Sequence, residues 1–287
     1  MHRGGLLALV VVLVGLAGCG GGEPTSARHA AETGAGQVAN GPAKASEQPA
    51  IGPTGLAPVH RTRPGPVPIL MYHVVGNITP GAPYPDLWVS PELFARQMEA
   101  LRVAGYHAVT LDAVLDNWRN RAKLPSKPVV LSFDDGYYGQ SHYAAPVLRR
   151  LGWPGVLNLA LHNLGHDGIS ARRVRRLIAA GWEIDSHTLT HPDLTTLAPH
   201  PLRRELAGSR AEIKRRFGVP VNAFCYPAGH YDPTVQAAVR AAGYRAATTE
   251  IPGDAAPDDD PYALPRIRVR GGESPTELVG ALASAAG

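Results

Sequence analysis

The chain has 287 residues, enough for one large domain or two small ones, and 44% of them are hydrophobic, which suits a globular α/β protein with an ample core. Lysine and arginine (28) exceed aspartate and glutamate (24) only slightly, which gives a formal net charge of +4. No stretch combines dense lysine and arginine with aromatic residues, so the composition argues against a nucleic-acid-binding protein.

Residues 1–18 have the features of an export signal. Arg3 supplies a positive charge, and the apolar run that follows, Leu6 to Leu16, is too short to span a bilayer comfortably. The run leads into Ala17-Gly18-Cys19, and together with Leu16 this segment resembles a bacterial lipobox. The resemblance implies cleavage before Cys19, a diacylglyceryl group on its sulfur, and an extracytoplasmic protein anchored to the bacterial cell membrane. The alternative is an uncleaved anchor with an incidental cysteine, which also places the mature protein outside the cytoplasm.

Residues 19–66 are expected to form a lipidated flexible linker. The segment is rich in Gly, Ala, Pro, Ser and Thr and has no apolar period, so it cannot bury enough surface to offset the entropy of ordering. The sequence contains two cysteines, Cys19 and Cys225, and with Cys19 bonded to lipid no disulfide can form within the mature chain. Burial of a hydrophobic core must therefore stabilise the domain expected over residues 67–287.

From Val67 onward, short apolar runs alternate with segments of helical length. The predicted strands are 67–72, 107–110, 128–133, 155–161, 182–186, 222–226, 246–249 and 267–269. The predicted helices are 91–104, 111–120, 142–151, 171–180 and 201–217. This alternation indicates parallel β/α units, which form either an open doubly wound sheet or a barrel, and the periodicity fits both.

Polar residues follow three of the predicted strands, at the ends where both architectures place active sites. Asp134 and Asp135 follow strand 128–133, His187 and His191 follow strand 182–186, and His73 follows the first strand. Two adjacent carboxylates repel each other, so one of them needs a cation or a proton nearby. An aspartate with two histidines leaves coordination positions open for water, which is typical of a catalytic metal site. Each motif alone also fits an ordinary turn or loop, but the combination of the motifs at strand ends favours a catalytic metal site.

The segments around these residues resemble the motifs of a known family. Ser132-Phe133-Asp134-Asp135-Gly136 resembles the Thr/Ser-Phe-Asp-Asp-Gly motif of the polysaccharide deacetylases, the NodB-homology domains of carbohydrate esterase family four. His187-Thr188-Leu189-Thr190-His191 resembles the family's His-Ser/Thr-x-x-His motif, and Phe224-Cys225-Tyr226-Pro227-Ala228-Gly229 resembles a variant of its third motif. The resemblance extends over about Val67 to Val269. It implies a distorted (β/α) barrel of about seven parallel strands.

The resemblance also implies a role for each matched residue. Asp134 would be the general base. Asp135, His187 and His191 would bind a divalent metal, by default Zn²⁺, with Co²⁺, Ni²⁺ or Fe²⁺ as alternatives. The backbone N–H of Ala228 would help to stabilise the tetrahedral oxyanion. A general acid must protonate the leaving amine, because an amide anion is a poor leaving group.

The sequence departs from the family pattern at two positions. No histidine follows His230, so the family's late general-acid histidine is missing. We expect His73 to take this role, since the first and last strands of a closed barrel are neighbours and some exopolysaccharide deacetylases share this permuted order. The alternative is a buried histidine bonded to a backbone carbonyl. Cys225 stands where the third motif carries an arginine that pairs with the base, and Arg266 on a late strand is the expected replacement.

Some charged residues lie outside these motifs. Arg172, Arg173, Arg175 and Arg176 form a basic face on the predicted helix 171–180. Such a face is usually solvated, and the alternative is that it attracts an anionic polymer. Asp185 alternates with His187 on its strand and is a candidate for supporting the metal site.

The sequence thus predicts a catalytic domain that removes N-acetyl groups, in a metal-dependent reaction, from a cell-surface or extracellular polysaccharide containing N-acetylglucosamine. The permuted histidine favours poly-N-acetylglucosamine. Two alternatives stay open: O-deacetylation of a polysaccharide such as xylan, and a lipid-anchored glycan-binding protein whose catalytic site has decayed. The expected partners are the polysaccharide and, through the lipid on Cys19, the membrane, without nucleic acid.

Overall fold

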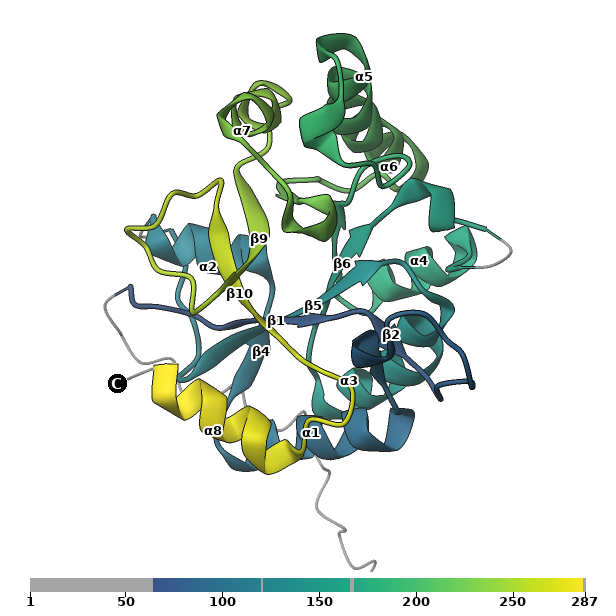
Figure 1. Cartoon of the computed structure of the whole chain (residues 1–287). Coiled ribbons are helices and arrows are strands. Elements are labelled where there is room, and N and C mark those ends of the chain that lie inside the picture. Colours follow the sequence, from purple (N-terminus) through teal and green to yellow (C-terminus); the bar gives the residue numbers. More distant parts are fainter. Residues whose placement is uncertain (1–63, 120, 166–167, 286–287) are drawn as a thin grey trace, which may run out of the picture. The chain divides into compact units, whose positions relative to one another are not determined.

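The computed structural model describes residues 64–119, 121–165 and 168–285 (Figure 1). The predicted export signal, the lipidated Cys19 and residues 20–63 of the predicted linker lie outside the described residues. Within the described part of the chain, no helix is long and apolar enough to cross a membrane.

Seven parallel strands of the described residues close into a barrel. They are β1 (Ile69–Tyr72), β5 (Pro128–Asp135), β6 (Val156–Leu159), β7 (Glu183–Ser186), β8 (Ala223–Cys225), β9 (Ala246–Pro252) and β10 (Leu264–Arg268). The barrel closes at β1, where Leu70 pairs with Ile267 of β10 on one side and with Leu131 of β5 on the other (Figure 1). An additional strand, β4 (His107–Val109), pairs with the start of β5. The closed ring confirms the distorted barrel and excludes the open sheet.

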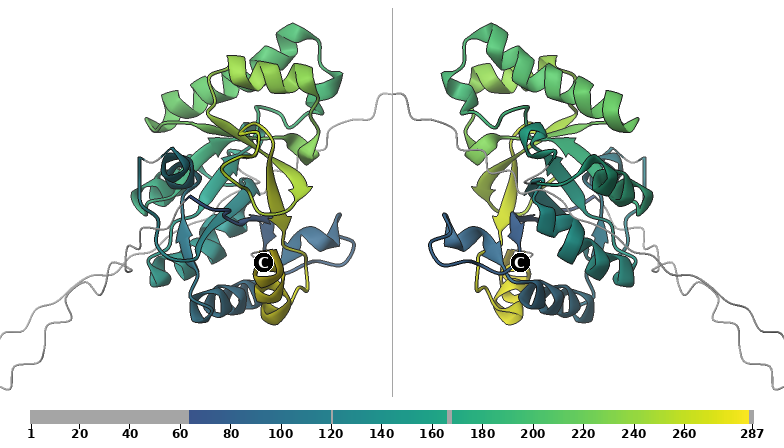
Figure 2. Two further views of the ribbon diagram at one scale, coloured as in Figure 1. Left: turned by 90° about the vertical axis from the view of Figure 1, so that its left-hand side faces the viewer. Right: turned by 90° about the vertical axis from the view of Figure 1, so that its right-hand side faces the viewer.

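The described residues contain eight α-helices, of which the first seven lie between strands and the last follows the final strand. They are α1 (Pro91–Val103), α2 (Leu111–Trp118), α3 (Ala145–Leu151), α4 (Ala171–Ala179), α5 (Pro199–Arg203), α6 (Ser209–Phe217), α7 (Pro233–Ala241) and α8 (Pro275–Ala285). Two short strands, β2 (Val74–Val75) and β3 (Trp88–Val89), form a separate pair. The last helix, α8, packs against α1, so the end of the domain contacts its beginning (Figures 1 and 2).

The structure differs from the predicted helices in three places. The predicted helix 201–217 is divided into α5 and α6 by a π-helical turn, Arg204–Gly208. The predicted helix 142–151 likewise begins with a π-helical turn, Gln140–Ala144. Helices α7 and α8 were not predicted, although the Asp232 side chain caps α7 by accepting a hydrogen bond from the Val235 N–H.

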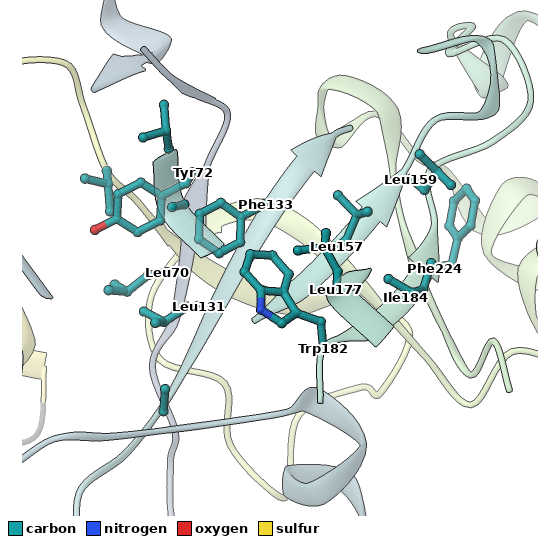
Figure 3. Close-up of a cluster of buried hydrophobic side chains, with 14 of the residues drawn as sticks. Leu70, Tyr72, Leu131, Phe133, Leu157, Leu159, Leu177, Trp182, Ile184 and Phe224 are labelled. Atoms are coloured by element: carbon teal, nitrogen blue, oxygen red, sulfur yellow. The ribbon is translucent and has the colours of Figure 1, made fainter. Parts of the chain in front are cut away.

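A cluster of aromatic residues packs the outer face of β5 against the surrounding elements. The ring of Phe133 lies 5.5 Å from the ring of Tyr72 and 5.0 Å from the ring of Trp182, centre to centre (Figure 3). Side chains alternate along a strand, so the neighbours of Phe133, Ser132 and Asp134, point to the opposite face, into the barrel. The buried rings therefore fix the strand that presents Asp134 to the interior.

Candidate active site

The end of β5 sends two consecutive aspartates in different directions. Asp134 continues the strand and is only 1% exposed, whereas Asp135 has a φ of 78°, in the left-handed region. Gly136 follows with a φ of 90°, and a Cβ atom there would lie 2.8 Å from Cδ1 of Leu159, so the turn requires glycine. Because of this turn, the carboxylates of Asp134 and Asp135 contact different side chains.

The Asp134 carboxylate is held by three buried side chains. Nη1 and Nη2 of Arg266 donate to its two oxygens at 2.9 Å each, in a bidentate pair. Nδ2 of Asn158 donates to Oδ1 at 2.7 Å, and Sγ of Cys225 lies 3.5 Å from Oδ2. Burial by itself raises the pKa of Asp134, but the charges of Arg266 and His73 outweigh it and hold the pKa well below its usual range. The group is therefore an ionised carboxylate.

Arg266 is itself fixed on every side. Its Nε donates to the Thr249 carbonyl at 2.7 Å, and its Nη1 donates to Oγ of Ser132 at 3.2 Å. Its Nη2 lies 3.2 Å from Sγ of Cys225. Burial by itself lowers the pKa of Arg266, and the Asp134 carboxylate more than reverses this effect. The structure thus brings the predicted replacement arginine into contact with the predicted base.

Asp135, His187 and His191 converge on one point. The Nε2 atoms of His187 and His191 lie 3.5 and 3.6 Å from the same oxygen, Oδ1 of Asp135. Nδ1 of His187 is 2.7 Å from the Cys225 carbonyl, so this nitrogen donates a hydrogen bond and Nε2 presents its lone pair to the site. One carboxylate and two imidazoles, with ligand atoms within 4.8 Å of one another, fit the divalent metal that the sequence motifs imply.

A second group, Asp134, His187 and Cys225, also places its ligand atoms within 4.8 Å of one another. Asp134, however, already receives two hydrogen bonds from Arg266 and one from Asn158. A metal ion at this second position would lie against the positively charged guanidinium group. The Asp135 group is therefore the better metal site.

The loop between His187 and His191 is held by Glu205 from the π-helical turn before α6. The Glu205 carboxylate accepts hydrogen bonds from the Leu189 N–H (2.8 Å), the Thr190 N–H (3.0 Å) and the Thr190 hydroxyl (2.9 Å). His191 has a φ of 58°, which is uncommon for a residue with a side chain and persists only where the surroundings enforce it. Sequence reasoning missed Glu205 because no local motif marks it.

His73 faces the base from the end of β1. Its Nε2 lies 3.8 Å from Oδ2 of Asp134. Its Nδ1 is buried and has no hydrogen-bond partner within the described residues, so the alternative of a ring bonded to a backbone carbonyl is not observed there. Gln140 fixes this segment instead, by donating to the His73 carbonyl at 2.8 Å. Burial lowers the pKa of His73, against the opposing effect of Asp134 and Asp135.

These side chains line a common cavity of about 340 Å³. Its walls include all the predicted site residues except the buried Arg266: His73, Asp134, Asp135, His187, His191 and Ala228. Ala228 has a φ of 51°, another left-handed residue at the site. Burial and the neighbouring Asp135 raise the pKa of Tyr137, on the same wall, to about 12, so this phenol stays protonated and can donate a hydrogen bond.

Several cavity and support residues were not predicted. The walls also contain Tyr84, Leu87, Tyr226, Glu250 and Arg268. Most of them lie on loops or strand ends without a recognisable motif. Asn158 had a detectable signal, since it is a polar residue in the otherwise apolar strand β6. Asp185, a candidate for supporting the metal site, instead accepts a hydrogen bond from the Ala223 N–H of β8 at 2.8 Å.

A parallel barrel with an aspartate–histidine–histidine group beside a buried, arginine-paired aspartate defines a hydrolase of the deacetylase class, and comparison with known proteins agrees. The model of the polysaccharide deacetylase family matches residues 121–247. A relative in Bacillus subtilis (strain 168), the polysaccharide deacetylase homologue YxkH, is 30% identical over 213 residues, which cover 74% of each protein. The chain therefore belongs to the polysaccharide deacetylase family, and its deacetylase relatives support a hydrolase that acts on amides.

Two further similarities concern structure and substrate. The structure of BC0361, a polysaccharide deacetylase from Bacillus cereus, matches with a TM-score of 0.68 at 27% identity and covers 76% of this chain and 69% of that one. The poly-beta-1,6-N-acetyl-D-glucosamine N-deacetylase of Escherichia coli (strain K12) is 42% identical over 62 residues, 21% of this chain and 9% of that protein.

Proposed function

We propose that the chain is a metal-dependent N-deacetylase of a polysaccharide containing N-acetylglucosamine. The observation that carries this proposal is the arrangement around Asp134. A buried carboxylate, kept ionised by Arg266, lies between His73 and the Asp135–His187–His191 group, and His73, Asp134 and the metal-binding group line one cavity. A base, an acid and a metal site on one cavity are what hydrolysis of an acetamide requires.

The residues divide the work of hydrolysis between them. Asp135, His187 and His191 would hold a divalent metal, which would supply Lewis-acid chemistry for the acetyl carbonyl and the attacking water. Asp134 takes the proton from that water, and Arg266 and Asn158 hold its carboxylate in place while it does so. His73, 3.8 Å from Asp134, gives a proton to the leaving nitrogen. The backbone N–H of Ala228, on the cavity wall, donates to the developing oxyanion.

The proton on His73 needs a source, because burial lowers the pKa of this imidazole. Asp134 is a suitable source, since its pKa is held far lower and a proton that it accepts passes readily to the imidazole beside it. The proton that Asp134 takes from water thus passes to His73 and then to the leaving amine. Nε2 of His73 lies 3.8 Å from Oδ2 of Asp134, so direct transfer requires a small approach of the imidazole or one bridging water.

The substrate class rests on two observations. The Escherichia coli relative is named for its action on poly-beta-1,6-N-acetyl-D-glucosamine. The acid histidine of this chain comes from the first strand, which is the order that the sequence shares with exopolysaccharide deacetylases. The contacts among the site residues argue against a decayed, purely glycan-binding protein.

Release of acetate tests this function. The purified full-length protein would be given N-acetylglucosamine oligomers before chelation, after chelation, and after zinc or cobalt is added back. We expect activity to disappear with the chelator, to return with metal, and to be absent in Asp134→Asn. If the protein releases no acetate with any metal, from these oligomers or from acetylated xylan, the proposal is wrong.

The lipobox-like segment Leu16–Cys19 supports a location at the outer face of the cell membrane. In the cells that produce the protein, Cys19→Ala should move it from the membrane fraction to the soluble fraction, since its acylated sulfur would be lost. A Cys225→Ala variant is the matched control, because Cys225 is buried in the barrel and should not affect fractionation. Continued membrane attachment of Cys19→Ala would point to an uncleaved anchor.

A further inference from the structure

A second concave surface lies between α3 and α4, outside the cavity described above. This α3–α4 groove has a volume of about 370 Å³ and is lined by Arg149 of α3, by Arg173 and Arg176 of α4, and by His142, with Leu177 in its apolar part. No aspartate or glutamate is among its lining residues. A groove that presents three guanidinium groups and no carboxylate is suited to bind an anion.

Among the described residues, no acidic side chain lines the groove to compensate its positive charge. Between Gly136 and Trp182 the sequence has six arginines and one acidic residue, Asp167, which lies outside the described residues. Within the part of the chain that the structure describes, none of the three groove arginines pairs with a carboxylate. On α6, by contrast, Arg215 pairs with Glu212. Helix α6 thus carries a counter-charge for its arginines, whereas no carboxylate of the described residues pairs with the three groove arginines.

The groove is connected to the catalytic cavity through one loop. The Arg173 guanidinium lies 4.5 Å from the centre of the Tyr138 ring and donates to the Tyr138 hydroxyl at 3.3 Å. Tyr138 follows Tyr137, which lines the catalytic cavity, and its own ring is 44% exposed. A glycan that leaves the cavity past Tyr137 would therefore reach Tyr138, whose ring packs against Arg173 and His142, and then the other groove arginines.

We propose that the α3–α4 groove binds carboxylate or phosphate groups carried by the glycan that the catalytic site deacetylates. The proposal rests on the proposed function and narrows it to an acidic polysaccharide. Among polysaccharides that contain N-acetylglucosamine, three arginines favour one that also carries acidic groups over an uncharged one. Guanidinium groups bind carboxylate and phosphate oxygens through two parallel hydrogen bonds, which would increase the affinity for the glycan and fix its position along the groove.

Direct binding tests the proposal. The full-length protein in an Asp134→Asn background, with metal present, would be titrated with carboxymethyl chitin, phosphorylated chitin and neutral glycol chitin of matched length. We expect one or both acidic polymers to bind at least about tenfold more tightly than glycol chitin. The variant Arg149→Gln/Arg176→Gln should lose about tenfold in affinity for the acidic polymer and keep its affinity for glycol chitin.

The variant Arg150→Gln/Arg172→Gln is the matched control. It removes the same charge from exposed positions on the same two helices, outside the groove, and should change affinity less than about twofold. Equal losses of affinity in the two double variants would mean that the polymer is attracted diffusely and would contradict binding in the groove. Equal binding of all three polymers by the Asp134→Asn protein would contradict it as well. The binding measurements use the inactive Asp134→Asn variant and therefore do not depend on catalysis. Failure of the proposed function would appear separately, as absence of acetate release from every polymer by the protein with Asp134 intact.

Discussion

At residue 225 the chain has a cysteine where the family motif carries an arginine, and the structure places Arg266 beside this cysteine, in contact with Asp134. The small Cys225 side chain leaves room for the guanidinium of Arg266, whose Nη2 lies 3.2 Å from Sγ. Arg266 reaches Asp134 from β10 and pairs with both of its carboxylate oxygens. The proposed base, Asp134, thus has an arginine partner that comes from β10.

Loss of the Arg266 guanidinium should weaken both catalysis and folding. We expect Arg266→Gln to lower kcat/KM by about 10- to 100-fold and to reduce the free energy of unfolding by about 3–5 kcal/mol, since it leaves the Asp134 charge buried without its partner. Arg266 lowers the pKa of Asp134, so its removal raises that pKa and activity should disappear at a higher pH on acidification. Denaturant titration and a pH profile of kcat/KM measure the two effects.

Arg266→Lys provides the control for this prediction, because it keeps the positive charge and loses the bidentate geometry. It should move the acidic limb of the pH profile less than Arg266→Gln does. Full activity of Arg266→Gln at neutral pH, or an unchanged acidic limb, would show that Asp134 does not depend on this arginine.

At the scale of elements, the metal site depends on a turn that interrupts a helix. The π-helical turn Arg204–Gly208 places the Glu205 carboxylate against the loop that carries His187 and His191. An uninterrupted helix over 201–217, as the sequence pattern predicted, would position the residues around Glu205 differently. The interruption therefore has a positional role, since it supports a loop with residues in left-handed conformations.

We expect Glu205→Gln to weaken metal binding by about 10- to 100-fold, because an amide has one acceptor oxygen where the carboxylate uses two. Its effect on the free energy of unfolding should be smaller, about 1–3 kcal/mol. Zinc affinity measured by competition with a chelator tests this. Glu212→Gln on α6 is the control, since Glu212 pairs with surface arginines, and equal zinc affinities for the two variants would argue against a role of Glu205 at the site.

The predicted elements also show what a single sequence can and cannot determine. The eight predicted strands are present, because each is a short apolar run between turn residues. β10 begins earlier than predicted, at Leu264, since Pro265 and Arg266 conceal its apolar pattern. Asp134, Asp135, His187 and His191 were found because each motif is local. Asn158 and Glu205 support the site from elements that only the folded barrel brings together, and no sequence spacing reveals them.

At the scale of the whole molecule, closure of the barrel brings the proposed acid, His73, next to the proposed base, Asp134. β1 lies between β10 and β5, so the first strand of the domain, the last strand and the strand of the catalytic aspartates are adjacent. Asp134 of β5, Arg266 of β10 and His73, which directly follows β1, consequently lie close together in the interior. An acid contributed by the first strand can thus occupy a position next to the base only because the sheet closes.

This placement makes the role of His73 testable through the leaving group. An amine must be protonated as it leaves, whereas an alkoxide leaves more readily, so His73→Asn should reduce N-acetyl hydrolysis by at least about 100-fold and O-acetyl hydrolysis by less than about tenfold. Acetate release from N-acetylglucosamine oligomers and from acetylated xylan measures the two reactions with one preparation. Asp134→Asn is the control, because loss of the base should abolish both. If His73→Asn slows both reactions equally, the imidazole does not act as the acid and its position beside Asp134 serves the base alone.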